Sequence, residues 1–279
     1  MKVAYEVAGT GDPLLLVSGL GQTGKRWRRV TPLLENEFTV VTFDNRETGG
    51  TGPSAAEFTL TAVAEDALAL MTDLGHERFF LAGISMGGMI AQEIVRIAGR
   101  DRVRAAVLFS TWGGASIAVR DDEVSLLFSS PGDDRPVWAK LAGPGFWEAH
   151  PDVIDEETQL SIEQATPPLA YMRQMQAIAA WDPDEDAVRS THVPIVVAHG
   201  ERDPFVLYEN GVLLAKRLGV ELVTYEGAGH VLECERPAEM ADLMRSHFAT
   251  ADRASGLPPP APKVRFPSVT APGGHLGDG

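Results

Sequence analysis

The chain has 279 residues, of which 44% are hydrophobic and 23% charged, an ordinary composition for a globular protein with a large core. Its formal net charge of -15 repels phosphate backbones, and no stripe of Lys and Arg interrupts that charge, so nucleic acid is not an expected partner. No apolar run approaches the roughly 18 residues that cross a bilayer, so we expect no membrane partner.

The first residues and the cysteine content indicate the compartment. Residues 1–6 lack the long apolar stretch and the small-residue cleavage site of a secretory signal, which predicts a cytoplasmic protein. The single cysteine, Cys234, has no partner for an intramolecular disulfide and leaves no Cys-based metal framework. The histidines also lack metal-ligand spacing. We therefore expect neither a metal nor another cofactor.

The beginning of the chain alternates strand-like and helix-like segments. Residues 2–7 alternate like a strand, and residues 14–17 form an unbroken apolar run typical of a strand covered on both faces. A glycine-rich loop over 18–24 then leads into a predicted helix over 27–34. Such a loop leaves backbone N–H groups facing the top of a sheet, and its glycine spacing fits neither a P-loop nor a dinucleotide fingerprint.

The same alternation continues to residue 109. After a strand over 38–43, the polar loop 44–53 follows, in which Asp44 and Arg46 are expected to brace the loop rather than to catalyse. The next predicted elements are a helix over 60–74, a strand over 79–84 and a strand over 103–109. This order predicts an α/β fold with a mostly parallel, doubly wound sheet, whose ligands bind beyond the carboxyl ends of the strands.

The alternation stops after residue 112 and resumes near residue 194, leaving about eighty residues of helical character, too many for a loop in a compact domain. Helices are predicted over 155–164 and 168–180. We therefore expect an inserted helical cap over 113–190 that covers the sheet edge. It separates two parts of one core, residues 1–112 and 191–250.

The second part of the core completes the predicted sheet. Its expected elements are a strand over 194–198, a helix over 206–218, a strand over 220–225 and a helix over 237–249. Residues 251–279 are rich in Pro and Gly and have too little apolar periodicity to pack. We expect them to form a flexible tail.

One serine lies where a strand turns into a helix. Residues 83–87 read Gly-Ile-Ser-Met-Gly, with glycines where the backbone bends too tightly for a Cβ. The bend pushes the hydroxyl of Ser85 out toward a substrate. This is the pattern of a nucleophile elbow.

Two further residues complete a predicted catalytic triad with Ser85. A serine hydroxyl is a weak nucleophile and needs a base, which a carboxylate orients. Asp203 and His230 follow predicted strands and come after Ser85 in the order Ser, Asp, His, which excludes the chymotrypsin and subtilisin arrangements. The backbone N–H groups of Leu20 and Met86 are predicted to hold the oxyanion. The rival carboxylates are Asp44, Asp182 and Asp184, and His199 is expected to be structural.

These motifs resemble those of a known family. The segments are Gly-Ile-Ser-Met-Gly-Gly at 83–88, His-Gly-Glu-Arg-Asp-Pro at 199–204 and Gly-Ala-Gly-His at 227–230. Together they resemble the α/β-hydrolase superfamily over residues 1–250. The resemblance implies the α/β-hydrolase fold and a cofactor-independent serine esterase or lactonase.

Residues 44–49 and the cap resemble one branch of that superfamily, which holds oxoadipate enol-lactonases, cofactor-free haloperoxidases and polyketide methylesterases. The branch implies natural-product (polyketide) tailoring as a setting. In one respect the chain departs from many relatives, because Ser18 precedes Gly19 where they have a histidine. The backbone N–H groups that could hold an oxyanion remain, but the imidazole that usually braces this loop is missing.

The large apolar side chains of the cap and its entrance predict a hydrophobic substrate pocket. Its expected lining residues are Trp112, Trp138, Phe146, Trp147, Met172 and Met175. Helical spacing puts Tyr171, Met172, Met175, Ile178 and Ala179 on one side of the helix over 168–180. Arg173 then falls on the opposite, solvated side. Packing within the cap explains the positions of Met172 and Met175 equally well.

We therefore expect a serine hydrolase that cleaves an ester or lactone of a small-to-medium hydrophobic substrate through an acyl-enzyme. One alternative keeps the triad but uses it for elimination or cyclisation of a polyketide-like product in a pocket that excludes water. The second alternative is a catalytically silent module that binds a ligand under the cap. A monomer and a homodimer are both compatible with the sequence.

Overall fold

The computed structural model describes residues 2–54, 57–119 and 140–255. In these residues, one sheet runs in the order β1-β3-β2-β4-β5-β6-β7. Strand β1 is antiparallel to β3, and all other neighbouring strands are parallel. The strands are β1 (Tyr5–Ala8), β2 (Asp12–Val17), β3 (Phe38–Phe43), β4 (Phe79–Ile84), β5 (Val103–Phe109), β6 (Ile195–Gly200) and β7 (Glu221–Tyr225). The predicted mostly parallel α/β sheet is confirmed.

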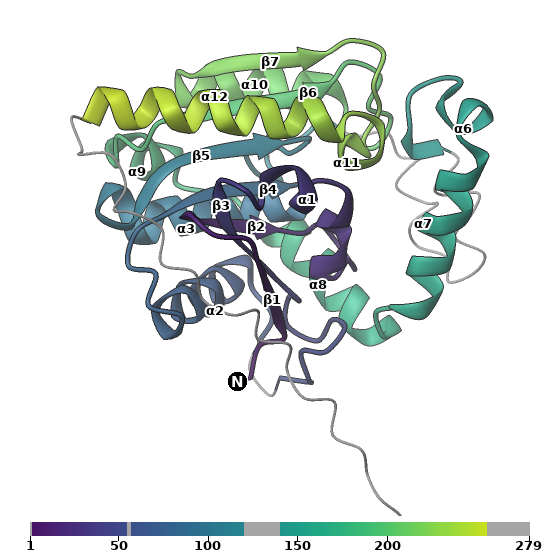
Figure 1. Cartoon of the computed structure of the whole chain (residues 1–279), viewed down its shortest axis with the longest axis horizontal. Helices are drawn as coiled ribbons and strands as arrows, with labels where there is room; N and C mark the ends of the chain where they lie inside the picture. The colour runs from purple at the N-terminus through teal and green to yellow at the C-terminus, as the bar shows by residue number, and fades with distance from the viewer. Residues whose placement is uncertain (1, 55–56, 120–139, 256–279) are drawn as a thin grey trace, which may run out of the picture.

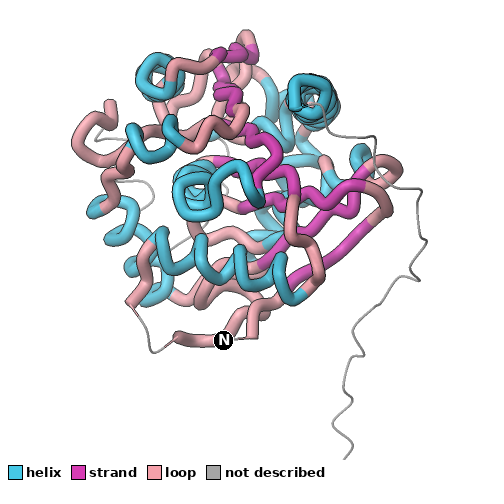
Figure 2. The backbone as a smooth tube through the Cα atoms, turned by 90° about the vertical axis from the view of Figure 1, so that its left-hand side faces the viewer, coloured by secondary structure: helices cyan, strands magenta, loops and turns pink. Residues whose placement is uncertain are grey.

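Helices cover both faces of the twisted sheet (Figures 1 and 2). The helices of one face are α2 (Leu60–Asp73), α3 (Met86–Arg102), α9 (Glu185–Ser190) and α10 (Tyr208–Leu218). The other face carries η1 (Gly24–Arg29), α1 (Thr31–Leu34), α11 (Leu232–Glu235) and α12 (Pro237–Ser255). This is the three-layer arrangement that an alternating strand and helix order predicts.

Strand β2 shows why the apolar runs are continuous. Leu15 and Val17 belong to the apolar cluster on one face of the sheet, whereas Leu14 and Leu16 belong to the cluster on the other. All four side chains are 0% exposed. Successive side chains of a strand point to opposite faces, so a strand covered twice needs apolar residues at every position.

Two predicted helix boundaries differ from the structure. The segment predicted as one helix over 27–34 consists of the 3-10 turn η1 and the short helix α1. Helix α12 continues to Ser255 rather than ending near residue 249. Ala251 is buried, and Asp252 pairs with Arg104, so the predicted flexible tail is wrong at its first five residues. The rest of the predicted tail lies outside the described residues.

The loop after β3 is braced as the sequence predicts. The two carboxylate oxygens of Asp44 accept hydrogen bonds at 2.8 Å from the N–H groups of Gly24 and Gly50. Arg46 forms an ion pair with Asp66 of α2. Both side chains therefore hold the loop against neighbouring elements.

Three helices between β5 and β6 lie beyond the carboxyl ends of the strands (Figure 1). They are α6 (Phe146–Ala149), α7 (Pro151–Glu163) and α8 (Pro168–Ala180), here called the insertion helices. Helix α9, which follows them, instead packs on the sheet through Val188. The predicted two-helix pattern thus appears as α7 and α8, with α7 beginning four residues earlier than predicted.

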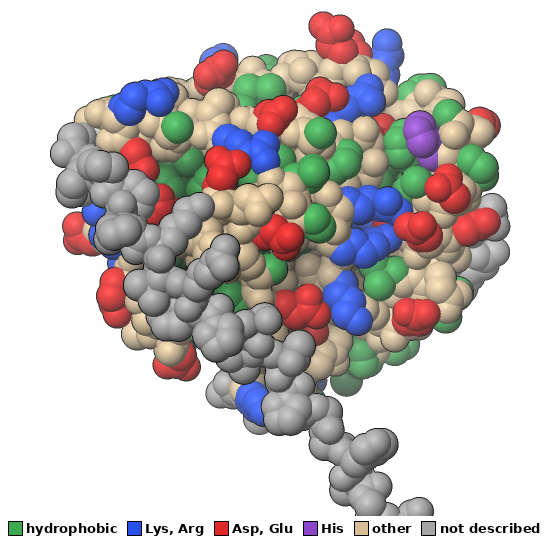
Figure 3. Space-filling model, in the orientation of Figure 1, with side chains coloured by type: hydrophobic (Ala, Val, Ile, Leu, Met, Phe, Trp, Pro, Cys, Tyr) green, Lys and Arg blue, Asp and Glu red, His purple; other side chains and the backbone are tan. Residues whose placement is uncertain are grey.

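The surface in view carries dispersed Asp and Glu side chains, in keeping with the net charge of -15 (Figure 3). Basic side chains gather on this face near α7. Among the described residues, none of the helices combines the length and the apolar character needed to cross a bilayer.

Candidate active site

Ser85 lies in a sharp turn between β4 and α3. Its φ of +58° is in a region that residues with a Cβ rarely occupy. The turn is possible because two neighbours are glycines. A Cβ on Gly83 would lie 2.2 Å from the Gly87 carbonyl oxygen, and a Cβ on Gly87 would lie 2.1 Å from that of Val17. The Gly-x-Ser-x-Gly spacing is therefore a steric requirement of this turn.

The Ser85 carbonyl group is held from two directions. It accepts a hydrogen bond of 2.9 Å from the Gly88 N–H and one of 2.8 Å from the Thr111 hydroxyl. The Ser85 N–H in turn donates to the carbonyl of Phe109, the last residue of β5. These bonds fix the strained backbone at the carboxyl edge of the sheet.

His230 and Asp203 form a pair at the same edge, after β7 and β6. The distance from His230 Nδ1 to Asp203 Oδ2 is 2.8 Å, and Oδ1 accepts from the N–H groups of Phe205 and Val206. Burial opposes ionisation of Asp203, but His230 and the hydrogen bonds from His199 and His230 lower its pKa to about 2. Asp203 is therefore a carboxylate bonded to Nδ1 of the His230 ring, an arrangement that chemically suits Nε2 to act as a base.

His199 also contacts this carboxylate. Its Nε2 lies 2.7 Å from the Val206 carbonyl oxygen and 3.3 Å from Asp203 Oδ2. Because a carbonyl oxygen only accepts, Nε2 carries the proton. His199, predicted to be structural, thus makes a direct contact with Asp203. The sequence feature that could have indicated this contact is the spacing of the two residues, since His199 lies near the end of β6 and precedes Asp203 by four residues.

The glycine-rich loop after β2 packs against the serine. A Cβ on Gly19 would lie 3.3 Å from the Ser85 Cβ, which places the neighbouring Leu20 beside the elbow. Met86 begins α3, so its N–H is at the positive end of the helix dipole. In the part of the chain that the structure describes, no protein acceptor takes a hydrogen bond from the N–H of Leu20 or of Met86. Both groups are therefore available as oxyanion donors.

The predicted pocket residues belong to different apolar clusters. Trp112 packs in the large apolar cluster over α3. Trp147 is buried in a smaller cluster with Val231, the residue after His230, and Phe146 packs against Trp147 at 4.8 Å between ring centroids. Of the predicted lining residues, Trp138 is outside the described part of the chain.

Helix α8 is rotated relative to its predicted orientation. Met172 is 57% exposed, so the prediction that it lines the pocket is wrong, whereas Met175 is partly buried. The buried side of α8 is centred on Gln174 and Ile178. The apolar pattern did not predict this side, because Gln174 is polar. Arg173, predicted to lie on the solvated side of the helix, has a side chain that is 41% exposed and forms an ion pair with Glu47 at 2.6 Å.

The rival carboxylates have other partners. Asp44 braces its loop, as described above. Asp182 is exposed and accepts from the Ser116 N–H at 2.9 Å, and Asp184 caps α9 by accepting from the Ala187 N–H. Neither is hydrogen-bonded to His230 in the described residues, which leaves Asp203 as the acid of this pair.

A buried ionic cluster joins the insertion helices to the core beside His230. Arg26 of η1 is buried and pairs with Glu157 of α7 and with Glu233 of α11. Arg28 and Arg29 also pair with Glu157, which is 0% exposed. We call Arg26, Glu157 and Glu233 the ionic cluster. This cluster could not be predicted from the sequence, because Arg and Glu side chains usually lie on the surface.

Glu235 makes a second link to the same region. Its carboxylate accepts hydrogen bonds of 2.9 Å from the N–H of Gly143, before α6, and from the N–H of Gly229, before His230. Burial raises the pKa of Glu235. The backbone around His230 is therefore tied to the segment that leads into the insertion helices.

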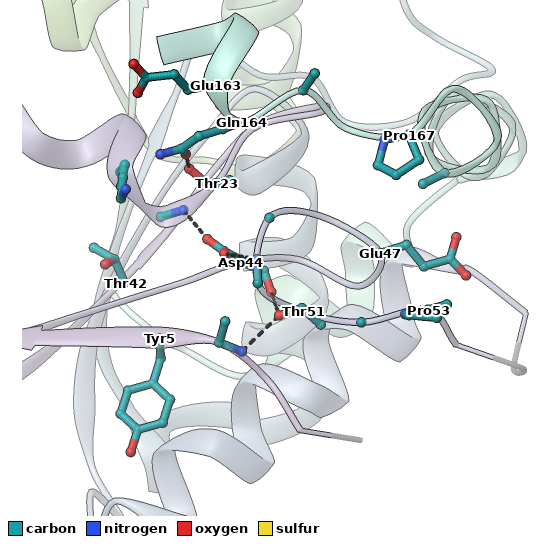
Figure 4. A pocket seen from close by; sticks show the side chains of 18 of the residues that line it. Tyr5, Thr23, Thr42, Asp44, Glu47, Thr51, Pro53, Glu163, Gln164 and Pro167 are labelled. Carbon is teal, nitrogen blue, oxygen red and sulfur yellow. Dashed lines mark hydrogen bonds between the residues drawn. The ribbon is translucent and has the colours of Figure 1, made fainter. Parts of the chain in front are cut away.

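A cavity of about 700 Å³ lies between the loop after β3 and the connection from α7 to α8 (Figure 4). Thr23, Asp44, Glu47 and Gln164 are among its lining residues, and none of the three predicted triad residues lines it. The described residues contain no group of three or more His, Cys, Asp or Glu side chains placed to hold a metal ion.

Known proteins share this sequence and fold. Residues 14–243 match the Alpha/beta hydrolase family. A protein of Mycobacterium tuberculosis named "Putative non-heme bromoperoxidase" is 36% identical over 115 residues, which are 40% of this chain and 43% of that protein. The match thus spans less than half of that relative's length.

Two solved structures have the same fold. An esterase from Thermogutta terrifontis superimposes with a TM-score of 0.77 at 24% identity, covering 89% of this chain and 93% of the esterase. The enol-lactonase from Burkholderia xenovorans LB400 gives 0.76 at 21% identity, covering 88% and 96%. The predicted resemblance to the branch of haloperoxidases and enol-lactonases is confirmed. The chain belongs to the Alpha/beta hydrolase family.

Proposed function

We propose that the protein is a cofactor-independent serine hydrolase that cleaves an ester or lactone through Ser85, His230 and Asp203. One observation carries the proposal: a strained serine elbow and a His–Asp pair joined at 2.8 Å follow strands that end at the same edge of the sheet. A purely structural role of Ser85 would not explain why its backbone holds a φ of +58°. It would also not explain why the neighbouring N–H groups of Leu20 and Met86 have no protein acceptor in the described residues.

In the acylation step, the Ser85 oxygen attacks the carbonyl carbon of the substrate while its proton passes to His230 Nε2. Asp203 stays ionised and stabilises the imidazolium through Nδ1. The N–H groups of Leu20 and Met86 donate to the oxyanion of the tetrahedral intermediate. When the intermediate collapses, the alkoxide takes the proton from Nε2 and leaves as an alcohol.

In the deacylation step, His230 Nε2 takes a proton from water, and the resulting hydroxide attacks the acyl carbon on Ser85. The second tetrahedral intermediate uses the same two N–H donors. Ser85 leaves with the proton from His230, and a carboxylic acid is released. For a lactone, the acid and the alcohol remain in one molecule.

We propose that the insertion helices form a cap and that the substrate has a hydrophobic acyl or alcohol group. Support comes from the apolar cluster of Trp147, Ile154 and Val231, which brings insertion side chains next to His230. Polyketide tailoring is the proposed setting, and it rests on the resemblance to polyketide methylesterases. Comparing hydrolysis of a polycyclic aromatic methyl ester with that of simple lactones tests this setting.

Labelling with a fluorophosphonate probe tests the proposed function. We expect one adduct per chain on the peptide that contains Ser85, and no adduct in Ser85→Ala. Ser190→Ala is the matched control, because Ser190 is an exposed serine of α9, and it should label like the wild type. A folded wild-type protein that takes up no probe, or full labelling of Ser85→Ala, would contradict the proposal.

A further inference from the structure

We infer that Gln174 of α8 is a positioning residue for the oxyanion loop, residues 18–24. Through it, the insertion helices set the orientation of the Leu20 N–H. The inference rests on the proposed function, in which that N–H donates to the oxyanion. It adds a residue on an insertion helix to a site whose other members belong to the core.

The Gln174 side chain is 0% exposed and is bonded at both ends. Its Oε1 accepts a hydrogen bond of 2.7 Å from the Gly21 N–H, and its Nε2 donates one of 2.9 Å to the Thr48 hydroxyl. Turning the amide over would point an NH₂ group at the Gly21 N–H. Because an unsatisfied buried donor costs about 1 to 3 kcal/mol, the amide has one preferred orientation.

A second insertion residue holds the other polar group of Gly21. The Gly21 carbonyl accepts a hydrogen bond of 2.9 Å from the Thr166 hydroxyl, in the connection between α7 and α8. Gly21 has a φ of +66°, and a Cβ there would lie 3.0 Å from the ring of Tyr171. Residues of α8 and of the connection before it therefore bond both backbone polar groups of Gly21, and the Tyr171 ring leaves little room for a side chain there.

Gly21 and Leu20 are the two central residues of one turn. The Gln22 N–H donates to the Gly19 carbonyl at 3.3 Å and closes that turn. A β-turn has few internal degrees of freedom, so fixing the N–H and the carbonyl of Gly21 also fixes the direction of the Leu20 N–H. The Gly19 end of the turn lies against Ser85, which places this N–H beside the nucleophile.

The core is hydrogen-bonded to the two ends of the loop, whereas in the described residues the side chains bonded to Gly21 at its tip come from α8 and from the connection before it. The Ser18 hydroxyl donates to the Thr23 carbonyl at 2.9 Å, and Asn45 donates to the Ser18 carbonyl at 3.2 Å. Figure 4 shows Gln164, which lies between α7 and α8, pointing toward Thr23, with Asp44 on the opposite side of the loop. In this chain, Gln174 and Thr166 supply the bracing of the tip.

The test compares Gln174→Met, which keeps the shape of the side chain but removes both hydrogen bonds, with Gln174→Glu, which keeps an acceptor for the Gly21 N–H. We expect kcat for a p-nitrophenyl ester to fall about 10- to 100-fold in Gln174→Met, with KM within about threefold, because an oxyanion donor acts mainly in the transition state. Affinity for a trifluoromethyl ketone, whose adduct with serine carries an oxyanion, should fall by a similar factor. Gln174→Glu should recover part of both losses.

The matched control is Gln176→Ala, an exposed residue of the same helix, which should keep wild-type kcat and inhibitor affinity. Should Gln174→Met fail to fold, Thr166→Val removes the bond to the Gly21 carbonyl and should show the same separation of kcat from KM. Wild-type kcat in a folded Gln174→Met, or a loss seen only in KM, would overturn the inference. Fluorophosphonate labelling of wild-type Ser85 separates this failure from failure of the proposed function.

Discussion

The sheet and the insertion helices are stabilised by different kinds of contact. In the sheet, every residue of β4 is buried, and its large side chains belong to the apolar clusters on the two faces. In the insertion, the fully buried positions include a carboxylate, Glu157, and an amide, Gln174. The contrast suggests that the sheet supplies most of the stability, while the insertion is placed by bonds with a required direction.

The physical reason lies in what each kind of contact specifies. Apolar burial is roughly proportional to area and has no directional requirement, so it tolerates small displacements. A buried ion pair adds little net stability, because removing the charges from water is costly, but breaking it leaves an unpaired charge. The ionic cluster and Gln174 therefore favour one placement of the insertion over others.

The largest expected effect on stability is in the sheet. Phe80 is buried and stacks on Phe248 of α12 with ring centroids 4.4 Å apart. We expect Phe80→Ala to lower the free energy of unfolding by about 3 to 5 kcal/mol, because it leaves a cavity in a packed core. Urea unfolding measures the loss. Val212→Ala, at an exposed position of α10, should stay within about 0.5 kcal/mol of the wild type.

The second prediction concerns the insertion. Glu157→Ala removes the partner that Arg26, Arg28 and Arg29 share, and it should cost about 3 kcal/mol by the same measurement, because Arg26 stays buried without one of its carboxylate partners. Glu156→Ala is the control, since Glu156 is exposed and pairs only with Arg29 in the described residues. Equal, small losses in both variants would show that the insertion is not held through the ionic cluster.

The contrast also explains what could be predicted from the sequence. The central strands of the sheet were predictable because they are apolar runs, and β1 because its residues alternate. Ser85, Asp203 and His230 could be placed at one edge of the sheet because each follows a predicted strand with small or polar neighbours. The inward face of α8 was not. Periodicity counts apolar residues, whereas the buried position there is Gln174, which looks like a surface residue until its partners, distant in sequence, are known.

The third prediction is a dependence on pH. The pKa of Asp203 falls from an ordinary value near 3.8 to about 2 on folding, so its stabilising effect is complete above about pH 4 and is lost as the pH falls toward 2. We expect the stability difference between wild type and Asp203→Asn to shrink by about 2 kcal/mol over that interval. A difference that stays constant from pH 5 to pH 2 would mean that Asp203 is not preferentially ionised in the folded protein.

The smallest expected effect is on selectivity. If Trp147 and the partly buried Met175 line the acyl pocket as the sequence predicts, Trp147→Ala and Met175→Ala should weaken transition-state binding of long p-nitrophenyl esters by about 1 to 2 kcal/mol and leave acetate esters nearly unchanged. Specificity constants for the two chain lengths measure this. Met172→Ala is the control, because Met172 faces solvent. Equal losses for short and long esters would assign these side chains to packing alone.

The most direct test of the central claim is to trap the acyl-enzyme. On rapid mixing with a p-nitrophenyl ester and quenching with acid, mass spectrometry of the wild-type protein should find one acyl group per active chain, on the peptide that contains Ser85. Ser85→Ala should carry no acyl group and should lose turnover by several orders of magnitude while its melting temperature is retained. An acyl group on another residue, or more than a tenth of wild-type turnover in Ser85→Ala, would contradict the assignment of Ser85 as the nucleophile.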